Sequence, residues 1–276
     1  MPRGVPKNGF RMTKKRMSEV VEQATNNDAN DKFGINERFE FINDMTMMLV
    51  NRQAASMIVS GSGGLGKSYS VIKALSDAGY TDISTVESFE VGTKVDPSKC
   101  FRVIKGYSSP KGLFRTLYEN REGVIVMDDT DSIFKDATSL NLLKAALDSY
   151  SRRIISYRAD IRDEDLPQVF EFKGAVIFLT NIPSVMLDQA LISRSMVVDL
   201  SMTTKQKVER MKHILFTQEF MPEVESNMKL DAITLIENIA ERVKDLSLRT
   251  LIQVIRIREA NPNNNWMRMS EYLLTS

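Results

Sequence analysis

The sequence predicts an α/β fold: an αβα sandwich with a mainly parallel sheet, followed by a small region made only of helices. Up to Leu200, short apolar segments typical of buried strands alternate with segments of helical spacing. One of these strands leads through a glycine-rich turn directly into a helix. After Leu200 every periodic segment has helical spacing, and we recognise no further strand.

The elements follow in a regular order. Residues 35–53 have helical spacing, with an apolar face of Phe39, Ile42, Met45, Met48 and Leu49. Strands are expected at 56–60, 100–104, 124–127 and 175–179. Between them we expect helices at 69–75, 110–121, 139–151 and from near Asp188 to Ser195. The later helices are expected at 204–220, 230–244, 247–260 and 266–274. This predicts an αβα domain over 34–200 and a small all-helical domain over 201–276.

Length and composition fit a soluble protein of this size. The chain has 276 residues, of which 42% are hydrophobic and 26% are charged. We find no apolar run near 18 residues and no signal peptide, so we expect no membrane contact and a cytoplasmic location. The single cysteine, Cys100, excludes an internal disulfide and suits a reducing compartment. The net charge of +1 neither requires nor excludes nucleic acid.

The first 33 residues look like a basic, partly flexible arm. Six cations precede the first acid, Glu19: Arg3, Lys7, Arg11, Lys14, Lys15 and Arg16. A polar linker over 26–31 follows them. Two interpretations remain open: a solvated chain terminus, or an arm that contacts phosphates.

The glycine-rich turn carries the most specific motif in the chain. Residues 61–68 match G-x-x-x-x-G-K-[ST], the phosphate-binding loop of nucleoside triphosphatases. Its backbone N–H groups can cradle phosphates, Lys67 can reach the β- and γ-phosphates, and the Ser68 hydroxyl can join the Mg²⁺ shell. The predicted nucleotide-binding set is Gly61, Ser62, Gly63, Gly64, Leu65, Gly66, Lys67, Ser68 and Tyr69. Spacing alone does not distinguish ATP from GTP.

Polar residues at the ends of two later strands complete a candidate site. The strand at 124–127 runs into Asp128 and Asp129, of which the first can hold Mg²⁺ and the second can orient the attacking water. The strand at 175–179 runs into Asn181, which either contacts the γ-phosphate or simply belongs to the turn before Pro183.

Two arginines extend the set. Arg194 closes the helix begun near Asp188, and Arg249 lies at the start of the helix at 247–260, where it could lie over the phosphates. Either arginine alone is as readily explained as a surface residue.

In this order the motifs resemble those of the AAA+ ATPase superfamily, including its helicase-related branch with viral members. The phosphate loop resembles its Walker A motif, Asp128 and Asp129 its Walker B motif, and Asn181 its sensor 1. Arg194 resembles the arginine finger and Arg249 resembles sensor 2. The resemblance implies an αβα nucleotide domain with a helical lid over 201–276 and ATP bound between them. It also implies Mg²⁺-dependent ATP hydrolysis and a homo-oligomeric ring or spiral, such as a hexamer. In that assembly Arg194 would complete the site of a neighbouring subunit.

One position departs from the common family pattern. Many members have Glu after the Walker B Asp, whereas this chain has Asp129. The shorter side chain moves the carboxylate back by about one C–C bond, so slow hydrolysis is one expectation. Some viral helicases of the superfamily have paired acids here, and Asp131 is a weaker substitute for the same role.

Two segments concern what the ATPase acts on. The segment 105–112 resembles a pore-facing loop, in which Tyr107 could grip a polypeptide or stack on a base and Lys111 could meet a phosphate. Alternatively, it is the start of a helix at Pro110 with an incidental aromatic residue.

Two β-prone runs at 153–158 and 168–173 resemble a hairpin inserted before sensor 1. Arg158, Arg162 and Lys173 suit DNA contact, whereas acidic residues at its tip do not.

Three hypotheses follow from these features. The first is an ATP-driven motor or loader on DNA, suited to a phage protein in a bacterial cytoplasm. The second is a protein remodeller that threads polypeptide past Tyr107. The third is a nucleotide-gated assembly scaffold with slow turnover, which the short side chain of Asp129 favours.

Overall fold

The computed structural model describes residues 32–84, 96–158, 166–217, 219–261, 263 and 265–276. The basic arm, apart from its last two residues, lies outside the described residues. So does the tip of the predicted hairpin, with Arg162 and its acidic neighbours. The role expected for the arm therefore stays a prediction.

A six-stranded parallel sheet forms the centre of the protein, in the order β2-β3-β4-β7-β1-β8. The four predicted strands are β1 (Ser56–Ser60), β3 (Cys100–Lys105), β4 (Val124–Asp128) and β7 (Ala175–Thr180). The two edge strands, β2 (Thr81–Asp82) and β8 (Met196–Asp199), were not predicted. β2 has two residues, both exposed, and the apolar run in β8 is only three residues long, so neither stands out as a strand in the sequence.

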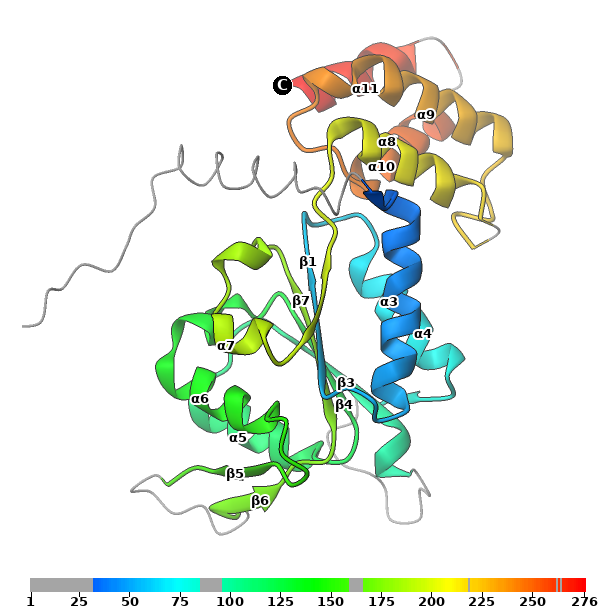
Figure 1. Cartoon of the computed structure of the whole chain (residues 1–276). Helices are drawn as coiled ribbons and strands as arrows, with labels where there is room; N and C mark the ends of the chain where they lie inside the picture. The colour runs from blue at the N-terminus through cyan, green and yellow to red at the C-terminus, as the bar shows by residue number, and fades with distance from the viewer. Residues whose placement is uncertain (1–31, 85–95, 159–165, 218, 262, 264) are drawn as a thin grey trace, which may run out of the picture.

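Helices cover both faces of the sheet (Figure 1). One face carries α3 (Ile35–Val50) and α4 (Lys67–Asp77). The other face carries α5 (Pro110–Glu119), α6 (Ala137–Ala146) and the short α7 (Gln189–Ile192). Alternate strand residues feed the two apolar cores: Val124 and Val126 face the first, whereas Ile125 and Met127 face the second. This confirms the predicted αβα architecture and is the arrangement that the AAA+ resemblance implies.

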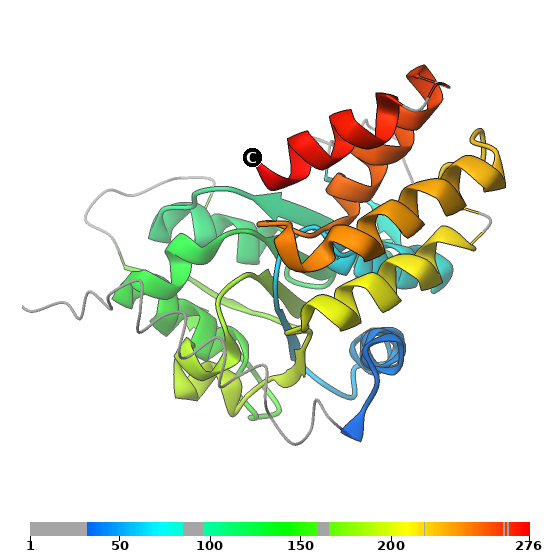
Figure 2. The ribbon, with the colours of Figure 1, turned by 90° about the horizontal axis from the view of Figure 1, so that it is seen from above.

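Beyond the sheet the described chain is helical. The helices are α8 (Thr204–Leu215), α9 (Ser226–Ile239), α10 (Leu248–Ala260) and α11 (Asn265–Thr275). They lie over the end of the sheet where β1 runs into the phosphate loop, as Figures 1 and 2 show. Their apolar residues join the same core as α3 and α4. The division into two domains at Leu200 stays a prediction.

Several predicted helix limits were too wide. The first helix ends at Val50, not at Gln53, and Met48 is 40% exposed, so it does not belong to the buried face. The helix expected to reach Ser151 ends at Ala146, and the one expected to reach Phe220 ends at Leu215. Helical spacing of the residues continues by chance beyond each helix end, so periodicity alone overestimates the helix length.

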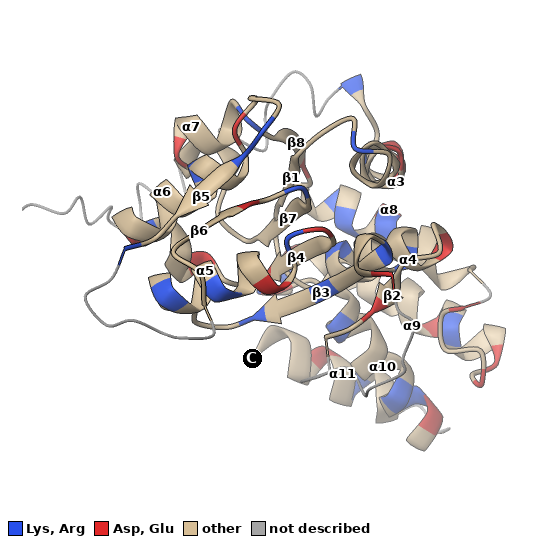
Figure 3. Cartoon of the chain, turned by 90° about the horizontal axis from the view of Figure 1, so that it is seen from below, with Lys and Arg blue, Asp and Glu red and all other residues tan. Residues whose placement is uncertain are grey.

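The predicted hairpin is present. β5 (Ile154–Ser156) and β6 (Val169–Glu171) pair antiparallel, with Ile155 opposite Phe170. The buried Phe170 ring contacts the rings of Phe114 and Tyr118 on α5, at centroid distances of 5.1 and 5.4 Å. The inner face of the hairpin is thus part of the second core. Figure 3 views the molecule from this end and shows Lys and Arg along the hairpin and on α5.

Candidate nucleotide-binding site

The phosphate loop joins β1 to α4 and packs against the start of α10. Gly64 has a φ of +76°, and a Cβ there would lie 2.9 Å from the Cβ of Ser247. The N–H of Leu248 donates to the carbonyl of Gly64 over 2.8 Å. Only glycine satisfies both the backbone angle and this close approach. The first turn of α10 therefore rests directly on the loop, as a lid helix over phosphates would.

Lys67 begins α4 and is buried. Its Nζ donates to Asn181 Oδ1 over 2.9 Å, to the carbonyls of Ser62 and Thr180 over 3.1 and 3.3 Å, and to that of Gly61. Burial lowers the pKa of Lys67 to about 8, although the nearby Asp129, Asp128 and Asp131 oppose this shift. A buried ammonium that only neutral oxygens contact is well suited to receive a phosphate.

Asn181 connects Lys67 to Asp129. Its Nδ2 donates to Asp129 Oδ1 over 2.9 Å, while its Oδ1 accepts from Lys67. These contacts form because β7 lies between β1 and β4. The segments that follow the three strands therefore meet at one edge of the sheet, and they carry Lys67, Asn181 and Asp129. The structure thus brings Asn181 beside the loop rather than leaving it in an isolated turn.

The two Walker-B-like acids have different surroundings. Asp128 ends β4 and is buried, and its Oδ2 lies 3.2 Å from Lys105 Nζ. Asp129 is exposed and has a φ of +53°, an unusual angle for a residue other than glycine. Asp131 accepts a 2.7 Å hydrogen bond from the Thr180 hydroxyl, which holds it on a different partner.

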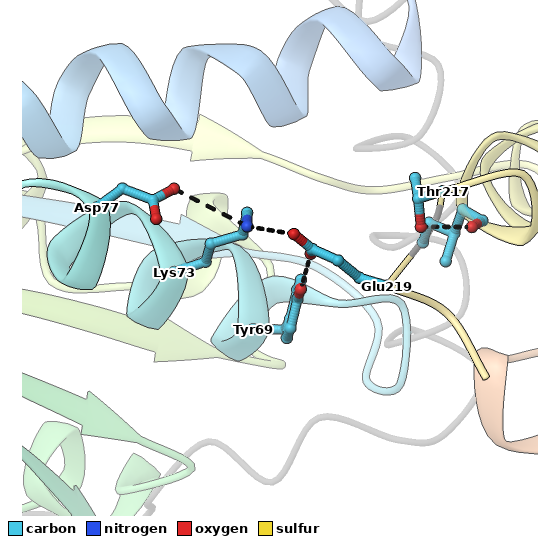
Figure 4. A network of polar contacts seen from close by, with 6 residues as sticks. Tyr69, Lys73, Asp77, Thr217 and Glu219 are labelled. Atoms are coloured by element: carbon cyan, nitrogen blue, oxygen red, sulfur yellow. Dashed lines mark hydrogen bonds and ion pairs between the residues drawn. The ribbon is translucent and has the colours of Figure 1, made fainter. Parts of the chain in front are cut away.

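The remaining residues of the loop motif also have definite positions. Ser68 is half-buried in the first turn of α4. Tyr69 is 58% exposed, and its hydroxyl donates to Glu219, which also pairs with Lys73 over 2.6 Å. Figure 4 shows both side chains directed at Glu219, which belongs to the connection between α8 and α9. Tyr69 and Lys73 therefore connect α4 to the helical region through Glu219.

The two predicted arginines lie at opposite ends of the sheet. Arg249 is exposed in the first turn of α10, next to Leu248 and therefore beside the phosphate loop. Arg194 lies at the far end, because its carbonyl accepts a 3.0 Å bond from Ser56, the first residue of β1. The length of β1, roughly 13 Å, separates Arg194 from the loop of its own chain. It borders a cleft of about 1120 Å³ that Arg52, Arg153 and Lys173 also line.

The donors at the loop fit a nucleotide with Mg²⁺. A cradle of backbone N–H groups, a buried lysine, a serine hydroxyl and one buried carboxylate is the set expected around phosphates and their metal. Within the described ranges no three His, Cys, Asp or Glu side chains cluster closely enough to hold a metal. Mg²⁺ at such sites is typically bound by one or two protein ligands together with phosphate oxygens and water.

Lys105 and Thr180 are contacts that the sequence-based prediction missed at this site. Each is the last residue of a strand, Lys105 of β3 and Thr180 of β7, and neither belongs to a recognised sequence motif. A signal existed nonetheless, because side chains at the carboxyl ends of neighbouring parallel strands share one edge.

No family model matches the sequence. The chain is 31% identical over 250 residues to an uncharacterized 36.7 kDa protein of the nrdC-mobD intergenic region of Enterobacteria phage T4. The match covers 84% of this chain and 72% of the T4 protein. The chain belongs to the family of this T4 protein. Among the described residues of this chain, no helix is both long and apolar enough to cross a bilayer.

Two solved structures show a weak similarity to this chain. One is Drosophila ORC bound to DNA, with a TM-score of 0.45, 15% identity, and coverage of 98% of this chain and 69% of that chain. The other is domain III of the Thermotoga maritima replication initiation protein DnaA, with a TM-score of 0.47 and 12% identity. That match covers 86% of this chain and 92% of the DnaA domain.

Proposed function

We propose that the protein is an AAA+ ATPase that binds ATP with Mg²⁺ at the phosphate loop and acts as an oligomeric motor or loader on DNA. The connected side chains of Lys67, Asn181 and Asp129 carry this proposal. An ammonium and a carboxylate meet at the same edge of the sheet, which supports roles in binding a phosphate and in orienting the attacking water. Hydrolysis requires these two groups on either side of a γ-phosphate.

Each residue of the site has a task in this scheme. The loop N–H groups and Lys67 hold the phosphates, and Ser68 and Asp128 hold the metal. When bound, Mg²⁺ neutralises charge on the phosphate oxygens. Asp129 orients the water, and Asn181 keeps Asp129 and Lys67 at a fixed separation.

The proposed oligomer follows from the two arginines. Arg249 acts within its own chain, because α10 rests on the loop. Arg194 is too far from that loop, so it reaches phosphates only on another copy of the chain. A ring or spiral supplies such a copy at every site, and a hexamer is one example.

DNA is the proposed substrate because cations and an aromatic ring are exposed in two places. Tyr107 is 79% exposed between Lys105 and Lys111, and the hairpin carries Arg158 and Lys173 on its exposed surface. Cations that contact phosphates and rings that stack on bases are the usual means of binding single strands. The T4 relative supports the expectation of a phage protein.

The test is ATP hydrolysis by the purified protein, with and without single- or double-stranded DNA, using Lys67→Ala as the blank. We expect turnover that rises with DNA and is absent from the variant. Robust turnover that ignores DNA would favour remodelling of a polypeptide gripped by Tyr107. Absence of turnover in both proteins, with ATP still bound by the wild type, would favour an assembly scaffold.

A further inference from the structure

The cleft at the amino end of the sheet, the end that Figure 3 faces, is lined by cations from separate parts of the chain. Arg52 follows α3, Arg153 directly precedes β5, and Lys173 follows β6. Together with Arg194 they border one cavity of about 1120 Å³. The proposed function gives Arg194 to a neighbouring subunit, but it gives no task to Arg52 or Arg153.

Arg153 is fixed in place by neutral groups. Its Nη1 and Nη2 donate to the carbonyls of Ala146 and Gly174 over 2.9 and 2.7 Å. Its guanidinium carbon lies 5.2 Å from the centroid of the Phe172 ring. These contacts supply no negative charge and leave other N–H groups of the guanidinium unused. Because Arg153 lines the cleft, those groups can donate to an anion there.

Arg52 has the same kind of surroundings. Its Nη2 donates to the carbonyl of Ser98 over 3.3 Å and to that of Glu122. Its backbone φ of +59° is unusual for a residue with a side chain, and glycine would relieve the strain. An arginine at such a backbone angle points to a task for its side chain.

The charges of Arg52 and Arg153 act on each other. Burial lowers the pKa of Arg153, and the nearby charge of Arg52 lowers it further. Among the described residues, no carboxylate forms an ion pair with either arginine or with Lys173. Cations held close together without an acid between them create a positive potential that a bound anion relieves.

Three acids also border the cleft, and they offset this charge only in part. They are Glu122, Asp148 and Glu171. Glu171 pairs over 3.2 Å with Arg152, which is outside the lining, so its charge is already compensated. Asp148 accepts from the N–H of Ser149 over 2.8 Å. The cations of the lining therefore outnumber the acids, and the cleft favours an anionic ligand.

The lining also offers an aromatic ring. Tyr150 precedes Arg153 in the connection between α6 and β5, and it is 76% exposed. Arginines that contact phosphates and rings that stack on bases are the usual means of binding single strands. The cavity exceeds the roughly 300–1,000 Å³ of a typical small-ligand site. Lys173 continues the row of cations toward the hairpin. A strand of several nucleotides therefore suits the cleft better than one free nucleotide.

We propose that this cleft binds single-stranded DNA, with backbone phosphates on Arg52, Arg153 and Lys173 and a base on Tyr150. The site is separate from the phosphate loop, because the length of β1, roughly 13 Å, lies between them. The inference rests on DNA as the proposed substrate and adds a binding surface at the amino end of the sheet.

The test measures the fluorescence anisotropy of a labelled oligothymidylate at low salt, without nucleotide. The cleft variant combines Arg52→Asn, which tolerates the positive φ, with Lys173→Gln on the exposed surface. We expect it to bind about tenfold more weakly or worse. Its affinity should also depend less on salt, with a slope smaller by about 1.4, because two phosphate contacts are lost.

The matched control combines Lys205→Gln with Arg242→Asn, which removes the same two charges from the exposed surface of the helical region. It should keep the affinity and the salt slope of the wild type. Thermal unfolding checks that both double variants are folded.

A second arm tests the ring and the kind of ligand. Tyr150→Ala should weaken binding by about fivefold or more, whereas Tyr150→Phe, which keeps the ring, should bind as the wild type does. Thymidine 5′-monophosphate should not displace the oligothymidylate at about a hundredfold excess, since one nucleotide makes only part of the contacts. Displacement by the mononucleotide would overturn the strand as ligand.

Unchanged binding by the cleft variant, or an equal loss in the control, would overturn the cleft site. DNA-stimulated ATP hydrolysis in that case would leave the proposed function intact. Absence of DNA binding by the wild type would overturn both.

Discussion

Lys67 is a buried lysine whose ammonium contacts only neutral oxygen atoms of its own chain. Its environment favours loss of the proton, and this lowers its pKa to about 8. A bound triphosphate reverses the balance, because its negative charge stabilises the ammonium. In the proposed function the lysine is therefore positioned for a phosphate, but near pH 8 part of the protein carries it deprotonated before a phosphate binds.

We expect nucleotide affinity to fall as the pH rises above about 8. Below this pH the free protein already carries the proton on Lys67, so affinity is flat. Above it, binding must take up a proton, and affinity falls by up to about tenfold per pH unit until the bound-state pKa is reached. Calorimetry between pH 7 and 9.5, in buffers of different ionisation enthalpy, measures both effects. Lys67→Arg stays protonated and should show no such slope; the same slope in this variant would contradict the assignment.

Asp129 should determine the rate of hydrolysis. We expect Asp129→Asn to lower turnover by about 10²- to 10³-fold, because the amide cannot orient and deprotonate water as a carboxylate does. Nucleotide affinity should change by no more than a few fold, since the amide oxygen can still accept from Asn181. Asp131→Asn is the control, because Asp131 bonds to Thr180 instead. If that control lowered turnover as much, Asp131 would be the better candidate.

At the scale of single elements, the phosphate loop is shaped by its fit to α10. Gly64 has a positive φ and faces Ser247, the residue before α10. Gly79 also has a positive φ, of +80°, but a Cβ there would meet no atom within 4 Å. Comparing alanine variants at the two positions therefore distinguishes the cost of backbone strain from the cost of steric crowding.

Gly64→Ala should lower the free energy of unfolding by about 2–4 kcal/mol, as the sum of backbone strain and overpacking. Gly79→Ala should cost only the strain, about 1 kcal/mol. Chemical denaturation of the nucleotide-free protein provides the comparison. Similar losses in the two variants would mean that the lid helix moves away easily and that its contact with the loop is weak.

At the scale of the whole molecule, the proposed function assigns different tasks to the two ends of the sheet. The carboxyl end holds the phosphate loop, Asp129 and Asn181. The amino end holds Arg194 beside a cleft of about 1120 Å³. One chain therefore presents a nucleotide site at one end and the arginine proposed for a neighbour's site at the other.

Arg194→Ala should lower turnover by about 10³-fold or more while ATP still binds, because an arginine that stabilises transition-state charge acts on the chemical step. Neither Arg194→Ala nor Lys67→Ala should be active alone. Mixed in equal amounts, they should regain part of the activity, since some interfaces pair an intact loop with an intact arginine. Failure of the mixture to regain activity, with mixed oligomers present, would contradict action between subunits.

Local sequence alone determined the main elements and the chemistry of the loop. The apolar runs that form β1, β3, β4 and β7 and the glycines and Lys67 of the loop act through neighbours in the chain, so short-range patterns reveal them. Tertiary structure decided which side chains meet. Lys67 and Asn181 are 114 residues apart, and they touch only because β7 inserts between β1 and β4. Likewise, Lys105 meets Asp128 through strand register, and Glu219 reaches Tyr69 from a connection between helices. Such pairings depend on how whole elements pack against each other, and no local periodicity encodes them.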